Sequence, residues 1–277
     1  MNKHLTRIAR YALVAATSGA FCGAATAVPY FWTDWTGADL NPGTGFQAQG
    51  TITTTTSSVL VTYTNPLGVA FYQPSGGIDY YVNGNTASGT ISPYTSTQVD
   101  NRPTGTDIVA LRFAGEQTLQ FSQTIANPVF SFVSLNGNGY AFDQDFDILS
   151  VGGTDGHACG YWGCGGVSKV IVDLGGGNFE YQLNSNNVGG SEPHGTLRFT
   201  GAFDTVTWRS SSNENWNGFT VGIQGTADEV LPCEVDPTLP QCNPTSVPEP
   251  NTLVLFGLGL VGLCYARRRH FGKSASS

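Results

Sequence analysis

Positive charge is scarce in this chain of 277 residues. Lysine and arginine together number 12, aspartate and glutamate number 20, and only 12% of all residues are charged. All the acids but few of the bases lie between residues 28 and 250, where the basic residues are Arg102, Arg112, Lys169, Arg198 and Arg209. An acidic surface repels phosphate backbones, so this composition excludes a nucleic-acid-binding protein.

Histidine and helical periodicity are also sparse. The same region contains only His157 and His194, and no G-x-S-x-G sequence occurs in the chain. A serine hydrolase of that type needs the sharp turn that this motif forms, so the sequence disfavours this class. Apolar residues do not recur here at the three- and four-residue spacing of an amphipathic helix.

Short runs of β-branched and aromatic residues are present instead, separated by turns rich in glycine and asparagine. They predict an all-β ectodomain over residues 28–226, an antiparallel β-sandwich of jelly-roll type. The expected strands are Val59–Tyr63, Val69–Tyr72, Ile78–Val82, Ile108–Phe113, Thr118–Phe121, Val129–Leu135, Tyr140–Val151, Val167–Leu174, Phe179–Leu183, Thr196–Thr200, Thr205–Arg209 and Phe219–Gln224.

Two tight turns are the clearest hairpin signals. Gly175-Gly176-Gly177-Asn178 separates a Val170/Val172/Leu174 stripe from a Phe179/Tyr181/Leu183 stripe, and Thr200-Gly201-Ala202 lies between the next two runs. Glycine supplies the positive backbone angles that such turns require. We therefore expect a β-hairpin at each of these positions.

The N-terminus has the three parts of a secretory signal peptide. Lys3, Arg7 and Arg10 accompany an apolar run from Tyr11 to Ala25, and Ala25-Thr26-Ala27 supplies an A-x-A-type site. This pattern predicts a signal peptide over residues 1–27, with cleavage after Ala27. Residues 227–246, which are rich in proline, are expected to form a semi-rigid stalk.

The C-terminus combines a polar motif, an apolar segment and an arginine cluster in that order. Val247-Pro248-Glu249-Pro250 precedes the apolar Leu253–Ala266, and Arg267-Arg268-Arg269 follows. This arrangement predicts a short transmembrane helix whose basic end stays in the cytoplasm. At 14 residues the apolar segment is shorter than a hydrocarbon core of about 30 Å requires, so thinning of the bilayer or snorkelling arginines would complete the span.

This arrangement resembles the PEP-CTERM sorting signal of Gram-negative bacteria that produce exopolysaccharide, here over residues 247–273. The resemblance implies recognition by exosortase, an integral-membrane enzyme similar to transpeptidases. It further implies an exported protein that the C-terminal helix anchors in the inner membrane before it reaches the cell surface or extracellular matrix. The resemblance covers only the end of the chain and implies nothing about the activity of the ectodomain.

Four cysteines lie outside the two hydrophobic ends, and an even number in an exported region favours disulfides. Local pairing of Cys159 with Cys164 and of Cys233 with Cys242 is the simplest of three connectivities. The first pair lies near a histidine, but its spacing does not match a zinc ribbon. We therefore expect a disulfide-closed loop that displays Tyr161 and Trp162.

Three carboxylates alternate in the sequence at Asp143, Asp145 and Asp147. In a strand, alternate side chains project from one face, so all three would lie together. Such a group of oxygen ligands could hold a structural Ca²⁺, or it could be a solvated strand face. Both interpretations remain open, and no other cofactor is expected.

Two loops before late strands contain residue types that bind sugars. Carboxylates accept hydrogen bonds from hydroxyl groups, and aromatic rings stack on the C–H faces of pyranoses. We therefore predict a non-catalytic exported protein that binds glycan of the exopolysaccharide layer. A glycoside hydrolase using Glu192 and Glu214 is the alternative, because a pair of carboxylates also cleaves glycosidic bonds. The predicted ligand residues are Trp162, Glu192, His194, Trp208, Glu214 and Trp216.

Overall fold

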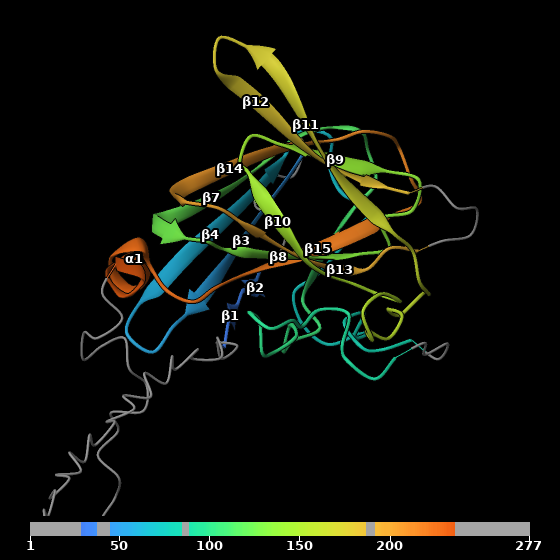
Figure 1. The fold of residues 1–277 in the computed structure, drawn as a ribbon, viewed down its shortest axis with the longest axis horizontal. Helices are drawn as coiled ribbons and strands as arrows, with labels where there is room; N and C mark the ends of the chain where they lie inside the picture. The colour runs from blue at the N-terminus through green and yellow to red at the C-terminus, as the bar shows by residue number, and fades with distance from the viewer. Residues whose placement is uncertain (1–28, 38–44, 85–88, 187–191, 236–277) are drawn as a thin grey trace, which may run out of the picture.

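The computed structural model describes residues 29–37, 45–84, 89–186 and 192–235, which form two antiparallel sheets and one helix (Figure 1). The seven-stranded sheet has the order β10-β13-β8-β15-β6-β5, and β1 pairs with β15. Its strands are β1 (Phe31–Trp32), β5 (Phe71–Gln73), β6 (Ile108–Leu111), β8 (Val129–Val133), β10 (Phe146–Val151), β13 (Gly195–Phe199) and β15 (Asn217–Ile223).

The second sheet has eight strands in the order β11-β12-β9-β14-β7-β4-β3-β2. Its strands are β2 (Asp34–Thr36), β3 (Phe46–Thr53), β4 (Ser58–Asn65), β7 (Gly115–Ala126), β9 (Gly139–Phe142), β11 (Val167–Gly175), β12 (Asn178–Ser185) and β14 (Ala202–Ser210). The two antiparallel sheets confirm the predicted all-β class, and the jelly-roll topology stays a prediction.

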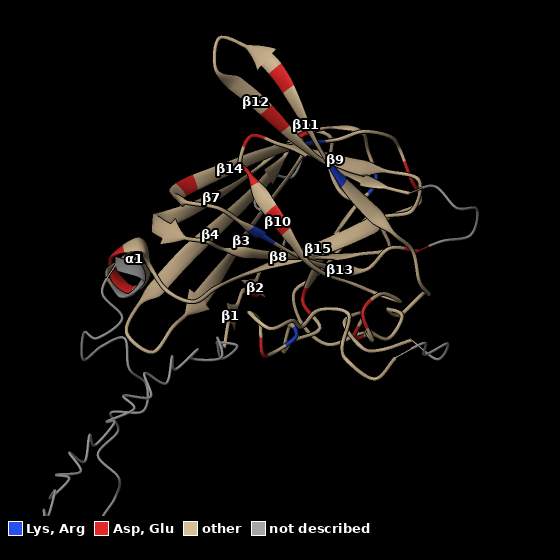
Figure 2. Ribbon diagram, viewed as in Figure 1, with Lys and Arg blue, Asp and Glu red and all other residues tan. Residues whose placement is uncertain are grey.

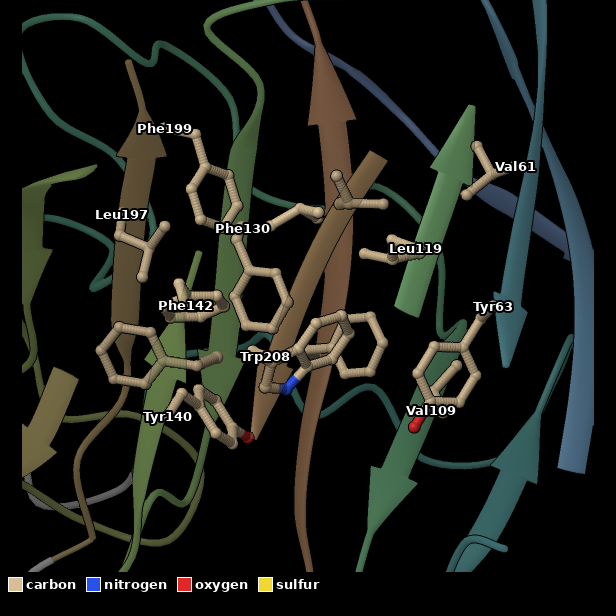
Figure 3. Packing of buried hydrophobic residues seen from close by; sticks show 14 of the residues in the cluster. Val61, Tyr63, Val109, Leu119, Phe130, Tyr140, Phe142, Leu197, Phe199 and Trp208 are labelled. Atoms are coloured by element: carbon tan, nitrogen blue, oxygen red, sulfur yellow. The ribbon is translucent and has the colours of Figure 1, made fainter. Parts of the chain in front are cut away.

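Aromatic side chains from both sheets meet in one core (Figure 3). Phe130 of β8 stacks on Phe219 of the neighbouring β15, with ring centroids 4.8 Å apart. Trp208 of β14, in the other sheet, presents its ring edgewise to Phe130 at 5.7 Å and to Phe219 at 5.3 Å. Contacts between large rings bury much apolar area, so this core holds the two sheets together as a sandwich.

The burial pattern along β4 explains why this strand could be predicted. Val59, Val61 and Tyr63 are buried, while Leu60 between them is 42% exposed. This is the alternation of a strand with one face on the core. In β8, by contrast, every residue is buried, because the seven-stranded sheet is covered on its outer face as well.

The cover of that outer face is a long segment between β5 and β6. Pro93 O accepts a hydrogen bond from Ser150 Oγ of β10 at 2.7 Å, and Tyr94 O accepts one from Thr196 Oγ1 of β13 at 3.2 Å. The expected strand at Ile78–Val82 lies in this segment and is wrong, because these residues pair with none of the described strands. Tyr80 and Tyr81 instead pack in one cluster with Ile108 and Val133 of the sheet.

Two further predictions of local structure need correction. The expected strand Tyr140–Val151 is divided into β9 and β10, which belong to different sheets. The turn at Thr200-Gly201-Ala202 joins β13 to β14, which also belong to different sheets, so it is a crossover and no hairpin. The hairpin at Gly175–Asn178 is confirmed, because β11 and β12 pair through Gly175 and Asn178.

The β11–β12 hairpin projects from the body of the sandwich (Figure 1). The apolar side chains near its tip are open to solvent, since Ile171 is 56% exposed, Leu174 62% and Phe179 43%, whereas Leu183 at its base is buried in the core. The hairpin therefore offers exposed aromatic and aliphatic positions that contribute little to the core, which makes it a source of control substitutions.

The helix α1 (Ala227–Val235) begins where the sequence predicted a stalk. Thr226 and Glu229 form a capping box, in which Thr226 N donates to Glu229 Oε2 at 2.8 Å. The other carboxylate oxygen accepts a hydrogen bond from Ser57 Oγ at 2.5 Å and another from Thr56 Oγ1. The main chain of Thr226 also forms an isolated antiparallel β-bridge with Ile125 of β7. The start of the predicted stalk is therefore a helix docked on the second sheet.

Residues 29–235, which we call the β-domain, contain the partners of every described strand and core cluster. Because the core closes within this part of the chain, we expect the β-domain to fold on its own. The predicted signal peptide, the rest of the stalk with Cys242, and the C-terminal segment lie outside the described residues, as does the side chain of Cys233. Within the described part of the chain, no helix has both the length and the apolar character needed to cross a membrane.

Candidate functional site

Strand order brings three loops together at one end of the seven-stranded sheet. β8 lies between β13 and β15 and runs antiparallel to both, with Phe132 opposite Gly195 and Val133 opposite Gly218. The end of β8 therefore meets the beginnings of both neighbours. Residues that follow β8 must lie beside residues that precede β13 and β15.

The three loops and the Cys159–Cys164 loop surround a small pocket, which we call the end pocket. Its volume is about 180 Å³. It contains four of the six predicted ligand residues, namely Trp162, Glu192, Glu214 and Trp216. The lining residues are Ser134, Asn136, Trp162, Glu192, Glu214, Asn215 and Trp216.

Glu192 is positioned by both of its neighbouring loops. Ser134 Oγ donates to one carboxylate oxygen, and Asn136 Nδ2 donates to the other at 3.1 Å. The main-chain N–H of Glu192 donates to Cys164 O at 2.9 Å, which links this carboxylate to the disulfide loop. Ser134 has a φ of 57°, a left-handed conformation that turns the chain sharply after β8. Sequence reasoning missed Ser134 and Asn136, because their role depends on strand order.

Glu214 lies on the other side of the pocket in a half-buried position. Its main-chain N–H donates to Arg112 O at 2.9 Å, and Asn217 Nδ2 donates to Glu214 Oε2 at 2.8 Å. Burial raises the pKa of the Glu214 carboxyl to about 7; the charge of Glu192 adds to the rise, and the hydrogen bond from Asn217 opposes it. Near neutral pH, a small change in environment therefore decides whether this carboxyl carries a charge.

Aromatic rings form a continuous row beside the two carboxylates. Trp162 is 53% exposed and contacts Tyr161 edgewise at 4.9 Å. Tyr161 contacts Tyr80 at 5.2 Å, Tyr80 contacts Trp216 at 5.0 Å, and Trp216 contacts Phe71 at 5.1 Å. The row fixes Trp216 against the body of the domain and leaves Trp162 open to a ligand.

The Cys159–Cys164 disulfide is present, as the sequence predicted. It closes the loop that carries Trp162, and the same loop is bridged by main-chain hydrogen bonds between Gly160 and Gly163 in both directions. A loop closed in two ways loses little further conformational entropy when a ligand binds. The pairing of Cys233 with Cys242 lies outside the described residues.

The prediction that Trp208 and His194 bind a ligand is wrong, because both side chains are buried. Trp208 is 2% exposed and packs in the core between the sheets (Figure 3). His194 is fully buried, with its ring edgewise to Tyr94 at 6.5 Å and Nδ1 2.5 Å from Glu192 O. Burial lowers the pKa of this imidazole to about 4, so it is neutral at physiological pH. Neither side chain reaches the end pocket.

The three alternating aspartates are also placed differently from the prediction. Asp143 and Asp145 lie in the turn between β9 and β10, and only Asp147 is in a strand. The prediction that all three carboxylates share one face of a strand is therefore wrong. In the described part of the chain, no three His, Cys, Asp or Glu side chains are grouped to hold a metal ion. Each aspartate instead has its own partner: Thr207 N donates to Asp143 at 2.9 Å, Lys169 pairs with Asp145 at 2.5 Å, and Arg198 pairs with Asp147 at 3.5 Å.

The chain therefore combines an all-β domain that carries a surface pocket with a C-terminal tail that has the pattern of a sorting signal. Residues 246–269 match the family model of the PEP-CTERM protein-sorting motif, which confirms the resemblance seen in the sequence. The motif implies export, a membrane-associated C-terminal signal and processing by exosortase. No curated protein and no solved structure matches the chain.

The raised pKa of Glu214 predicts a pH-dependent stability that Glu214→Gln removes. Folding favours the protonated carboxyl, so its contribution is complete below the ordinary pKa of 4.5 and is lost as pH rises through about 7. Partial solvent access reduces the expected loss to about 1–2 kcal/mol. In urea unfolding of the β-domain, the glutamine variant should match the wild type at pH 4 and exceed it by this amount at pH 8.

The exposed Glu116 supplies a control for this measurement, since Glu116→Gln makes the same charge change away from the pocket. It should alter stability by a similar small amount at both pH values. The titratable groups that face Glu214 are Glu192 and the Tyr140 hydroxyl, whose pKa burial raises well above its usual range. An equal effect of Glu214→Gln at pH 4 and pH 8 would contradict the assignment.

Proposed function

We propose that the exported β-domain binds a glycan of the exopolysaccharide layer at the end pocket and does not catalyse a reaction. The observation that carries this proposal is the convergence of Trp162, Glu192, Glu214 and Trp216 on one pocket from three loops, of which the loop before β15 supplies both Glu214 and Trp216. Carboxylate oxygens accept hydrogen bonds from sugar hydroxyl groups, and an exposed indole ring offers a flat apolar face to a pyranose.

The size of the pocket fits one sugar unit of a longer chain. Its volume of about 180 Å³ is below the range of roughly 300–1,000 Å³ of sites that enclose a drug-sized ligand. A polymer would place one residue in the pocket and continue over the surface. This mode suits retention on a matrix, since many weak contacts along one polymer add up to firm attachment.

The tail supplies the location that this function requires. In our proposal the apolar segment after Pro250 anchors the protein in the inner membrane, exosortase processes it near the motif, and the β-domain then reaches the cell surface or extracellular matrix. No cofactor is needed for binding of this kind.

A glycoside hydrolase is the second candidate, and the pKa of Glu214 favours it. A carboxylic acid that is still protonated near neutral pH can donate a proton to a leaving oxygen, as the acid of a glycosidase does. Glu192 would be the second carboxylate, held by Ser134 and Asn136. The same two residues would then have catalytic roles.

Retention of the β-domain by purified exopolysaccharide of the producing bacterium tests the binding proposal. Trp162→Ala and Trp216→Ala should each lower the affinity by about threefold to tenfold, because each removes one aromatic contact. Phe179→Ala, which removes an exposed aromatic ring from the β11–β12 hairpin, is the matched control and should bind like the wild type. Equal retention of all four proteins would contradict the proposal.

Incubation of the wild type and of Glu214→Gln with the same polysaccharide separates binding from hydrolysis. Prolonged incubation should release no new reducing ends from the polysaccharide if the domain only binds. Release by the wild type that Glu214→Gln abolishes, with binding retained, would establish the hydrolase in place of the binding module.

A further inference from the structure

The lysine and arginine side chains of the β-domain do not line the end pocket, and most of them form ion pairs elsewhere. Lys and Arg are few in the described part of the chain (Figure 2). Four of them form ion pairs with other acids: Arg102 with Asp79 at 2.8 Å, Lys169 with Asp145 at 2.5 Å, Arg198 with Asp147 at 3.5 Å and Arg209 with Glu180 at 3.0 Å. None of these pairs includes Glu192 or Glu214.

The fifth basic residue, Arg112, contacts the site through its main chain only. Arg112 O accepts a hydrogen bond from Glu214 N, and the guanidinium lies 5.8 Å from the centre of the Phe113 ring. Among the residues that the structure describes, no lysine or arginine lines the end pocket. The protein itself therefore places no counter-charge between the two carboxylates.

Neutral groups hold the carboxylates in place. The hydrogen bonds described above come from the Ser134 hydroxyl and from the amides of Asn136 and Asn217. Such donors orient a carboxylate but do not cancel its charge. Burial and the mutual repulsion of Glu192 and Glu214 raise the pKa of Glu214, which is the expected sign of negative charge without compensation.

We propose that the end pocket selects a sugar that carries a protonated amine, as in a deacetylated amino-sugar polymer, over neutral or N-acetylated sugars. This inference rests on the proposed glycan-binding function and names its ligand class. An ammonium group donates three hydrogen bonds, which the free lone pairs of Glu192 and Glu214 can accept. The faces of Trp162 and Trp216 attract the same cation through their π electrons.

Other sugar classes fit the pocket less well. A neutral sugar would leave two carboxylates near each other without a cation, and a uronic acid would add a third negative charge to the same space. Repulsion between like charges in a partly desolvated site weakens binding and so provides specificity. The negative charge of the pocket thus favours sugars that carry a positive group over neutral and acidic sugars.

The test compares two oligosaccharides that differ in the amine alone. A hexamer of glucosamine and a hexamer of N-acetylglucosamine are titrated into the β-domain by calorimetry at pH 6.5. An ammonium group beside Glu214 favours the charged form of that carboxyl, so binding of the glucosamine hexamer completes the ion pair. We expect the glucosamine hexamer to bind at least about tenfold more tightly. Its affinity should fall when sodium chloride is raised from about 50 mM to 0.5 M, because salt screens the charges.

Substitution of the carboxylates locates the effect. Glu192→Gln and Glu214→Gln should each reduce the preference for the glucosamine hexamer about tenfold while leaving the N-acetylated hexamer within about twofold. Glu116→Gln, the exposed control, should keep the wild-type preference. The comparison in the wild type does not depend on any variant folding.

The outcomes separate the inference from the function on which it rests. Equal affinity for the two hexamers, or a preference for the N-acetylated one, would overturn the amine selectivity and leave glycan binding intact. Retention on purified exopolysaccharide without binding of the glucosamine hexamer would do the same. Absence of binding to the hexamers and to the purified exopolysaccharide would overturn the proposed function itself.

Discussion

Replacement of Pro248, Glu249 and Pro250 by alanine should leave the protein in the inner-membrane fraction. The wild-type protein, by contrast, should be transported onward to the cell surface or matrix. These residues lie in the segment that matches the PEP-CTERM motif, and the motif implies processing by exosortase. An enzyme that reads a short motif loses its substrate when all three distinctive side chains are removed. Fractionation of cells, followed by detection of the β-domain, measures the effect.

A matched control is available a few residues upstream. Alanine at Pro237, Pro240 and Pro244 removes three prolines from the segment before the motif and leaves residues 246–269 unchanged. This variant should be distributed like the wild type. An unchanged distribution of the motif variant would remove exosortase from the account.

Phe130→Ala should cost the β-domain about 3–5 kcal/mol of its free energy of unfolding. Phe130 is fully buried between the sheets and contacts Phe219, Trp208 and Phe142. Deleting its ring leaves a cavity that surrounding rings on paired strands cannot close. Since a domain has only about 5–15 kcal/mol of stability, the loss should be plain in urea unfolding.

Phe179→Ala removes the same ring from the projecting hairpin, where the side chain is 43% exposed. It should cost less than about 1 kcal/mol. Similar losses at the two positions would mean that the rings between the sheets do not hold the sandwich together.

The sequence predicted those features that depend on neighbouring residues. Alternation along Val59–Tyr63 gave β4, the glycine-rich turn at Gly175–Asn178 gave the β11–β12 hairpin, and close spacing gave the Cys159–Cys164 disulfide. In each case, the partner that decides the structure lies within a few positions of the chain. Thr226 and Glu229, which cap the start of α1, are a further local signal of this kind, and they favour a helix at the start of the predicted stalk.

The candidate site could be predicted only in part, because it depends on strand order. The sequence placed Glu192 and Glu214 before strands, but whether they meet depends on β8 lying between β13 and β15. No local pattern encodes that arrangement. Tryptophan and histidine also serve equally well in a core and in a ligand site, so only burial could show that Trp208 and His194 belong to the interior.

The location of the ligand site is tested most directly by chemical-shift mapping. The isotope-labelled β-domain is titrated with purified exopolysaccharide of the producing bacterium, and amide and indole signals are followed. We predict changes at the end pocket, including Ser134, Asn136 and the indole of Trp162, with the β11–β12 hairpin unaffected. Changes confined to the hairpin, or none at saturating polysaccharide, would contradict the account.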